Sequence, residues 1–472
     1  MLRDIIEAID EKGDFVHDAE HRAAARHQVR TRERVPDFII DPEREKALVR
    51  KMDLHMMPML WIMLLMNYIA RTNIGNAKIG GMYADLNMSS NGYSLVLSIF
   101  YAGYLIFEVP SNMLLSRSQP RVYLPLLMVI WGGFQWCAKG ITSVAGMAVF
   151  RFVLGLAEAG FYPGVMFLMS CWYKPHEGAV RMSIFYSATL VAGAFGSLLA
   201  GGIIDSMDGL AGTHGWQWLF IIEGCVSVVL GGVAYFVLPN YPATTPWLTE
   251  HEKQLATRRI LYAQAQEEGP SMALSQAFKE ALKDPKTWCF LLAYNFINPP
   301  CTITYFIPTL VESMGYSDQM AQFMAVPVYL VSLVFSILGG IVADRTRQKA
   351  AVIAAAGILS TFMFVFCAIV QNAKIKYVFL CFGGAGIWTA LPVFLSWVVI
   401  MFDGREKRAI AIAWINGFGQ LSSIYGAFFW PEKDAPRYAT GFTITCSFTG
   451  FMVVMIIFTR WAFGDKGVWR TS

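Results

Sequence analysis

Long apolar stretches recur along most of this chain, and they constrain its fold more than any other feature. A helix needs roughly 20 predominantly apolar residues to cross a bilayer. Apolar length and the polar breaks between the runs predict about twelve such helices. Their approximate cores are residues 56–75, 93–115, 122–138, 144–173, 182–204, 216–238, 288–311, 320–343, 350–370, 377–401, 409–429 and 440–463. The sequence therefore predicts an all-α membrane protein.

The composition agrees with this prediction and argues against several other classes of protein. Of the 472 residues, 55% are hydrophobic and 15% are charged, which departs from the composition of soluble proteins. The eight cysteines show no Cys-x-x-Cys spacing and predict neither a zinc site nor a disulfide framework. The sequence contains no HExxH, GxxxxGK[ST] or GxSxG motif. We expect no enzymatic activity, cofactor, metal site or nucleic-acid binding.

Basic residues predict how the spans are oriented. They gather in alternate loops, at Arg117 and Arg121, at Lys174 and Arg181, at 345–349 and at 405–408. By the positive-inside rule, these loops and both termini face the cytoplasm. The glycosylation sequence that begins at Asn87 then lies outside. Residues 1–51 are charged throughout and lack the apolar core of a signal peptide. We expect an integral protein of the plasma membrane.

One polar segment, residues 239–286, divides the spans into two halves of about six each. The halves resemble one another, because residues 340–345 occupy the place in the second half that residues 112–117 occupy in the first. Many secondary transporters use such repeats to build a central site between two bundles. We expect two pseudo-symmetric six-helix bundles, at residues 56–238 and 287–463. Three cytoplasmic segments are expected to flank and connect them, namely an N-terminal tail at 1–55, the central loop at 239–286 and a C-terminal tail at 464–472.

Arg71 places a positive charge inside the first apolar run. A charge near the middle of a membrane helix costs about 2.5 to 3.5 kcal/mol on insertion scales. Such a side chain should therefore face the protein interior and have a partner. The cost of keeping Arg71 there indicates a function.

The fourth span contains two opposite charges, Arg151 and Glu158, seven residues apart. This spacing puts them on one face of a helix but separates them by about 10.5 Å along its axis, too far for a direct pair. Glu158 lies near the middle of its span, as Arg71 does, so the two are expected to pair if their helices pack together. The alternative is that the pair only locks two helices, although a buried salt bridge is weak evidence for stability.

The second half has no buried acid or base as central as these. Its seventh and eleventh spans carry hydrogen-bonding side chains at helical spacing, namely Asn295, Asn298, Thr302 and Tyr305, and Asn416, Gln420 and Ser423. Polar residues inside membrane helices more often hold helices together than bind ligands, and that alternative applies to each of them. A cationic half that faces a polar, neutral half would suit a small organic anion.

Several motifs follow one another along the chain: Arg-Thr-Asn-Ile-Gly-Asn-Ala at 71–77, Tyr-x-x-x-Glu-Val-Pro-Ser-Asn at 104–112, and segments 151–164, 215–224 and 434–438. In these motifs and their order, the sequence resembles the anion:cation symporter family of the major facilitator superfamily, and specifically its allantoate permease-like branch. The resemblance runs from about residue 55 to residue 464.

The resemblance implies a monomeric helical carrier for small carboxylates, vitamins or their amide and ureide relatives, usually moved with protons. Tyr68, Arg71 and Tyr104 would line the substrate cavity, and Arg151 and Glu158 look like the family's coupling pair. The family often has Asp before the first-helix arginine, where this chain has Ala70. That difference leaves Glu158 as the candidate for the single titrating group.

We therefore predict proton-coupled uptake of a small organic anion by alternating access. Asn295, Asn298, Trp388 and Asn416 are expected to complete the site. The expected partners are the anion, protons and the lipid bilayer. Two alternatives remain: an anion facilitator or exchanger without proton coupling, which Ala70 favours, and a nutrient sensor that signals through the N-terminal tail or the central loop.

Overall fold

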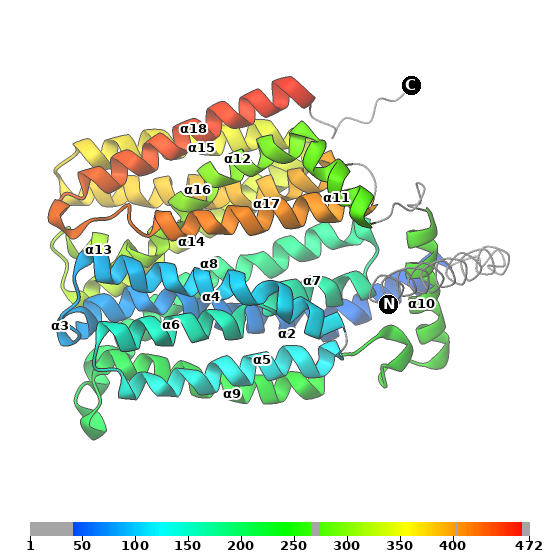
Figure 1. The fold of residues 1–472 in the computed structure, drawn as a ribbon, viewed down its shortest axis with the longest axis horizontal. Helices are drawn as coiled ribbons and strands as arrows, with labels where there is room; N and C mark the ends of the chain where they lie inside the picture. Colours follow the sequence, from blue (N-terminus) through cyan, green and yellow to red (C-terminus); the bar gives the residue numbers. More distant parts are fainter. Residues whose placement is uncertain (1–40, 117, 267–273, 403–404, 465–472) are drawn as a thin grey trace, which may run out of the picture. The chain divides into compact units, whose positions relative to one another are not determined.

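A computed structural model describes residues 41–116, 118–266, 274–402 and 405–464 (Figure 1). Most of the predicted N-terminal tail, and all of the predicted C-terminal tail except Gly464, lie outside the described residues. The chain divides into two units, residues 1–50 and 51–472. The second unit contains all the predicted spans.

The described part of the chain is helical and contains no β-strand, so the prediction of an all-α membrane protein is confirmed. Eight helices within it are long and apolar enough to cross a membrane. The other four expected spans coincide with helices α4 (Ser90–Ser116), α5 (Pro120–Gln135), α12 (Pro285–Cys301) and α17 (Arg405–Gly426).

The first bundle begins with α2 (Pro42–Ala77), which continues through a π-helical turn, Lys78–Met82, into α3 (Tyr83–Asp85). Gly81, with φ of 100°, permits the kink in that turn because L-residues with a side chain rarely adopt this conformation. The remaining helices are α4, α5, α6 (Val144–Glu158), α7 (Phe161–Trp172), α8 (Pro175–Met207) and α9 (Gly215–Val237).

Glycines bring α4 and α6 into close contact. A Cβ added to Gly155 of α6 would lie 2.2 Å from the carbonyl oxygen of Phe100 in α4. A Cβ on Gly103 of α4 would lie 2.4 Å from the carbonyl oxygen of Phe152 in α6. Small residues let membrane helices approach in this way. The contact brings Phe100 and its neighbours on α4 beside the charged residues of α6.

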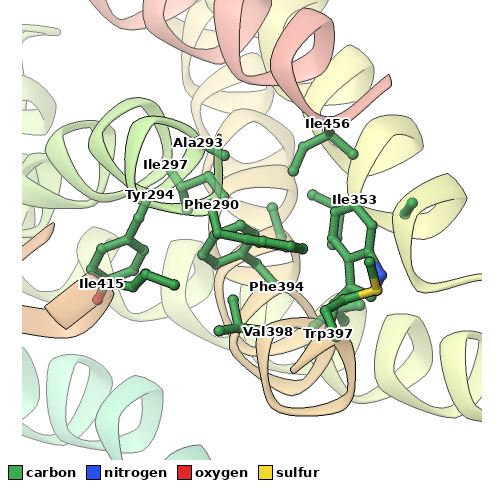
Figure 2. Close-up of a cluster of buried hydrophobic side chains, with 14 of the residues drawn as sticks. Phe290, Ala293, Tyr294, Ile297, Ile353, Phe394, Trp397, Val398, Ile415 and Ile456 are labelled. Carbon is green, nitrogen blue, oxygen red and sulfur yellow. The ribbon is translucent and has the colours of Figure 1, made fainter. Parts of the chain in front are cut away.

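The second bundle contains α12, a 3₁₀ turn at Thr302–Tyr305, α13 (Ile307–Glu312), α14 (Asp318–Thr346), α15 (Lys349–Ile369), α16 (Ala373–Met401), α17 and α18 (Ala439–Phe463). Figure 2 shows its buried core, in which Phe290 of α12 packs edge-on against Trp397 of α16, with ring centroids 4.8 Å apart. Pro299 and Pro300 come just before the point where α12 ends, as their inability to donate backbone hydrogen bonds favours.

Two shorter helices of the central segment lie at one end of the second unit: α10 (Glu250–Gln266) and α11 (Leu274–Lys283) (Figure 1). Lys51 and Glu252 form an ion pair of 2.9 Å that attaches α10 to α2. Phe278 of α11 packs against Trp414 of α17. We call this the central-segment end of the unit, and the end that carries α3 and α13 the opposite end.

Hydrogen bonds between the two bundles lie toward the opposite end. The Tyr93 hydroxyl donates to the Tyr305 carbonyl oxygen over 3.0 Å. Ser94 donates to the carbonyl oxygen of Ala427 over 2.9 Å, and Ser98 donates to that of Ile424 over 2.8 Å. These bonds hold α4 of the first bundle against α17 and the 3₁₀ turn of the second.

Candidate functional site

Arg71 of α2 and Glu158 of α6 form an ion pair inside the first bundle, as the sequence predicted. The Nε of Arg71 donates to Oε2 of Glu158 over 2.8 Å. Arg71 is 8% exposed, and Glu158 is completely buried. The pair therefore lies away from lipid, where its desolvation is offset by mutual attraction and by hydrogen bonds.

Asn67 also binds the Glu158 carboxylate, and it does so through the same oxygen as Arg71, so the other oxygen has no partner among the described residues. Its Nδ2 donates to Oε2 of Glu158 over 3.0 Å. The second carboxylate oxygen, Oε1, is buried and has no hydrogen-bond partner among the described residues. That oxygen can accept a proton or a hydrogen bond from a ligand. The sequence analysis missed Asn67, although it lies one helical turn before Arg71 on the same face.

Three aromatic rings surround the Arg71 guanidinium. Its Cζ lies 4.8 Å from the ring centroid of Tyr104 and 5.3 Å from those of Tyr68 and Phe100. A guanidinium is attracted to the faces of such rings and keeps its hydrogen-bond donors available at its edge. The structure thus brings together the three predicted cavity residues, Tyr68, Arg71 and Tyr104. It adds Phe100, one turn before Tyr104, which the sequence analysis missed.

Arg151 is also brought to this site, but it contacts backbone atoms of α2. Its Nη2 donates to the carbonyl oxygen of Arg71 over 3.2 Å, and its Nη1 donates to that of Ala70 over 3.4 Å. Its Cζ lies 4.8 Å from the ring centroid of Phe100. Arg151 therefore holds the part of α2 that carries Arg71.

The second bundle approaches the site through Tyr305. The hydroxyls of Tyr305 and Tyr101 are 2.7 Å apart. A Cβ on Gly75 would lie 2.6 Å from the Tyr305 carbonyl oxygen, so α2 touches the backbone of the second bundle there. Residue 305 belongs to the polar stripe that the sequence analysis identified in the seventh span.

The other predicted residues of the second bundle have partners of their own. Asn298 donates to the Gly419 carbonyl oxygen and to the hydroxyls of Ser422 and Ser423, over 2.8 to 3.1 Å. These bonds join α12 to α17, which is the helix-holding alternative stated above.

Asn295, Trp388 and Asn416 are likewise not joined to the ion pair by any hydrogen bond between described residues. Asn295 donates to the Leu291 carbonyl oxygen over 2.9 Å and accepts from Tyr425 over 3.2 Å. The Trp388 ring lies 5.5 Å from that of Tyr329. Asn416 is half-buried on α17.

The site thus offers two guanidinium groups, of which that of Arg151 is bound to the backbone of α2, together with one carboxylate that has an open oxygen and with phenol hydroxyls. Among the described residues, no group of three or more His, Cys, Asp or Glu side chains is arranged to hold a metal ion. Such a set can bind an anion at Arg71 and exchange a proton at Glu158.

The profile of the Major Facilitator Superfamily matches residues 60–427. This chain belongs to that superfamily. Its helical architecture is therefore the major facilitator fold that the sequence predicted, and the chain is an integral membrane protein that acts as a secondary transporter.

Curated relatives and solved structures agree with this membership. The chain is 33% identical over 415 residues to the MFS-type transporter cnsO of Penicillium expansum, covering 84% of this chain and 79% of the relative. It is 30% identical to the putative metabolite transport protein NicT of Pseudomonas putida, and the match covers 80% of this chain and 87% of that relative. A bacterial homolog of the human lysosomal transporter Spinster, solved in an inward-facing and occupied conformation, has the same fold, with a TM-score of 0.67 and 14% sequence identity. The match covers 92% of this chain and 100% of that structure's chain.

Proposed function

We propose that this transporter takes up a small organic anion together with protons, as a member of the anion:cation symporter family and of its allantoate permease-like branch. The observation that supports this most is the Arg71–Glu158 pair, in which a buried arginine is held by an acid that has one open oxygen. A fixed ion pair needs no open oxygen, whereas a proton-binding acid does.

In this mechanism a proton from bulk water binds Oε1 of Glu158 and neutralises the carboxylate. Arg71 then loses its counter-charge, and the substrate carboxylate takes that place. After the bundles rearrange, the proton leaves to the other compartment. Glu158 becomes charged again, recovers Arg71 and displaces the substrate. Each ligand thus favours a different partner for Arg71, which is the differential interaction that coupling requires.

The proposal also includes the location and assembly of the protein. It lies in the plasma membrane as a monomer, with both termini in the cytoplasm. They follow from the basic loops of the sequence and from the family resemblance. The same topology puts the opposite end outside the cell and the central-segment end in the cytoplasm.

An uncoupled anion facilitator or exchanger is the second candidate, and Ala70 favours it. The family often has Asp at this position, whereas Ala70 supplies only a carbonyl oxygen, which accepts from Arg151. With one buried carboxylate at the pair, the mechanism has a single acid on which coupling can depend.

Uptake into proteoliposomes tests the proposal and separates the two candidates. The full chain is reconstituted, and uptake of labelled nicotinate, pantothenate, allantoate, tartrate and succinate is measured with and without an inward proton gradient. Symport predicts that at least one compound accumulates and that accumulation collapses with the gradient. A facilitator only equilibrates its substrate, whatever the gradient.

Glu158→Gln examines the role of the acid in the same vesicles. This variant is expected to lose gradient-driven accumulation and to keep substrate exchange, because the neutral amide mimics the protonated acid. A Glu158→Gln protein that still concentrates substrate on a proton gradient contradicts the mechanism.

A further inference from the structure

Glu223 is a buried acid of the first bundle that the proposed transport mechanism does not use. It lies about two turns into α9 and is 1% exposed. Neither of its carboxylate oxygens has a hydrogen-bond partner among the described residues, and none of these residues forms an ion pair with it. A carboxylate is very unfavourable in such a place unless a cation accompanies it, so the charge state of Glu223 is in question.

Glycines bring α9 into close contact with α5 beside this acid. The two helices lie side by side (Figure 1). A Cβ on Gly224 of α9 would lie 2.4 Å from the carbonyl oxygen of Gly132 in α5 and 3.0 Å from the Cβ of Gln135. A Cβ on Gly132 would lie 2.7 Å from the Cβ of Ser227. Gln135 of α5 and Ser227 of α9 therefore lie at the contact between the two helices.

The direction of the helices places Glu223 at the height of Gln135. They run antiparallel, because a Cβ on Gly231, further along α9, would lie 3.2 Å from the carbonyl oxygen of Pro125, which comes earlier in α5. Glu223 precedes Ser227 by four residues, so it lies on the same side of α9, one turn before it. One turn back along α9 corresponds to one turn forward along α5, which reaches Gln135.

The polar atoms of Gln135 and Ser227 are unsatisfied in the same way as those of Glu223. Both residues are 0% exposed. Oε1 and Nε2 of Gln135 and Oγ of Ser227 make no hydrogen bond with a described residue, although buried polar atoms normally do. The group includes an N–H donor, whereas a metal ion requires oxygen ligands. It suits a neutral carboxylic acid, which supplies an O–H donor and keeps an acceptor oxygen.

Other ionisable side chains near α9 do not neutralise Glu223. They are Arg121 and Tyr123 of α5, Cys137 and Lys139 of the 3₁₀ turn Trp136–Gly140, Lys78 of the π-helical turn, Asp205 and Asp208 at the end of α8, Arg151 and Glu158 of α6, and His214, Cys225 and Tyr235 of α9 and its N-cap. None of them forms a hydrogen bond or an ion pair with Glu223. Arg151 is bound to the backbone of α2, and Lys139 is exposed.

We propose that Glu223 is a second proton-binding site of this protein, at which the acid holds a proton at neutral pH and loses it only in alkaline solution. The uncharged acid lets α5 and α9 pack closely, and loss of the proton loosens them by leaving a charge between them. This inference does not rest on the proposed function, because it requires neither an organic anion nor proton exchange at Glu158.

Unfolding of the purified full-length protein in detergent tests the proposal from about pH 5 to about pH 9, by comparison with Glu223→Gln. An exposed glutamate loses its proton near pH 4.3, so residue 223 of the unfolded chain is charged throughout this range. While the folded protein keeps the proton, each unit of pH should raise the unfolding equilibrium constant of the unmodified protein about tenfold relative to that of Glu223→Gln. The rise stops at the pH where the folded protein releases the proton.

Infrared spectra at neutral pH give a second measurement that does not depend on unfolding. A protonated carboxylic acid has a C=O stretching band that is distinct from the bands of a carboxylate and of an amide. Glu223→Gln should remove one acid's share of this band. Glu250→Gln is the matched control, because Glu250 of α10 has a side chain that is 81% exposed. It should change neither the band nor the pH dependence of unfolding.

Three outcomes would overturn the proposal. The first is a ratio of the two unfolding constants that stays the same between about pH 5 and about pH 7. The second is an acid band that survives Glu223→Gln. The third is a Glu223→Gln protein that does not fold, since the amide has the size of the neutral acid and also carries both a donor and an acceptor. Uptake by the unmodified protein and by Glu158→Gln judges the proposed function separately, whatever is found at residue 223.

Discussion

Arg71 and Glu158 face each other across α2 and α6, with Nε and Oε2 separated by 2.8 Å in a place that water barely reaches. Neither residue is near the other in the chain, and each lies in a helix that is long and apolar enough to cross a membrane. The pair therefore joins α2 to α6, and in the proposed mechanism it is the place where the charged ligand binds.

Arg71→Gln should destabilise the protein by about 3 to 5 kcal/mol, because it leaves the Glu158 carboxylate buried without a counter-charge. Glu158→Gln should cost less, since the guanidinium keeps its three aromatic neighbours. The double variant should recover most of the lost stability while it remains inactive in transport. Thermal unfolding in detergent measures all three. Effects that simply add would show that the residues do not interact.

Gly155→Ala should impair both folding and transport. Its new Cβ would lie 2.2 Å from the Phe100 carbonyl oxygen, so α6 must move away from α4. Overpacking of this kind costs about 1 to 3 kcal/mol and would displace Glu158, one turn further along α6. Gly133→Ala is the matched control, because its Cβ would have no atom within 4 Å. The unfolding temperature and the uptake rate should both fall in the Gly155→Ala variant and should stay unchanged in the Gly133→Ala variant.

Asn298→Ala should lower stability more than it changes substrate affinity. The substitution removes the amide whose Nδ2 contacts three acceptors of α17, while the Gly419 carbonyl still accepts from Ser422, and the loss of these bonds should cost about 1 to 3 kcal/mol. Asn416→Ala should behave in the opposite way, raising KM with little change in unfolding temperature. A large rise in KM at unchanged stability for Asn298→Ala would instead place its side chain in the substrate site.

Asp284 should make stability depend on pH at the central-segment end. Partial burial alone would raise the pKa of this carboxyl, but hydrogen bonds from the Lys407 ammonium and the Lys286 backbone outweigh it and hold the pKa below its usual range. A lowered pKa in the folded state stabilises the protein above the ordinary aspartate pKa of about 3.9, and this stabilisation is lost as the pH falls through the lowered value.

Two substitutions at this position separate charge from capping. Asp284→Asn keeps a cap for the first turn of α12 and removes the charge, so its unfolding temperature should lie below that of the unmodified protein at pH 7 and approach it below about pH 4. Asp284→Ala should be less stable than Asp284→Asn at both pH values, by about 1 kcal/mol, because it also loses the cap. A difference between Asp284→Asn and the unmodified protein that persists in acid would contradict the pKa argument.

Local pattern predicted the fold well because the bilayer leaves few choices. Apolar runs of the required length must be helices in this setting, and the polar residues 239–286 could only interrupt them. The pairing of Arg71 with Glu158 was also predictable, since two buried opposite charges near the middle of their spans stabilise each other. Lys78 follows Arg71 by seven residues, but it lies beyond the predicted core 56–75, and the aromatic rings beside it come from three different segments.

The sequence by itself determined the number and character of the helices, the division into two halves and the central charges, because each depends on residue type and spacing along one segment. Only the tertiary structure decided the rest. It directed Asn298 to α17, turned Arg151 toward the backbone of α2, added Asn67 and Phe100 to the ion pair, and buried Glu223 where α9 packs against α5. The physical reason is that helical periodicity assigns a side chain to a face, whereas its partner depends on which helix packs against that face and at what height.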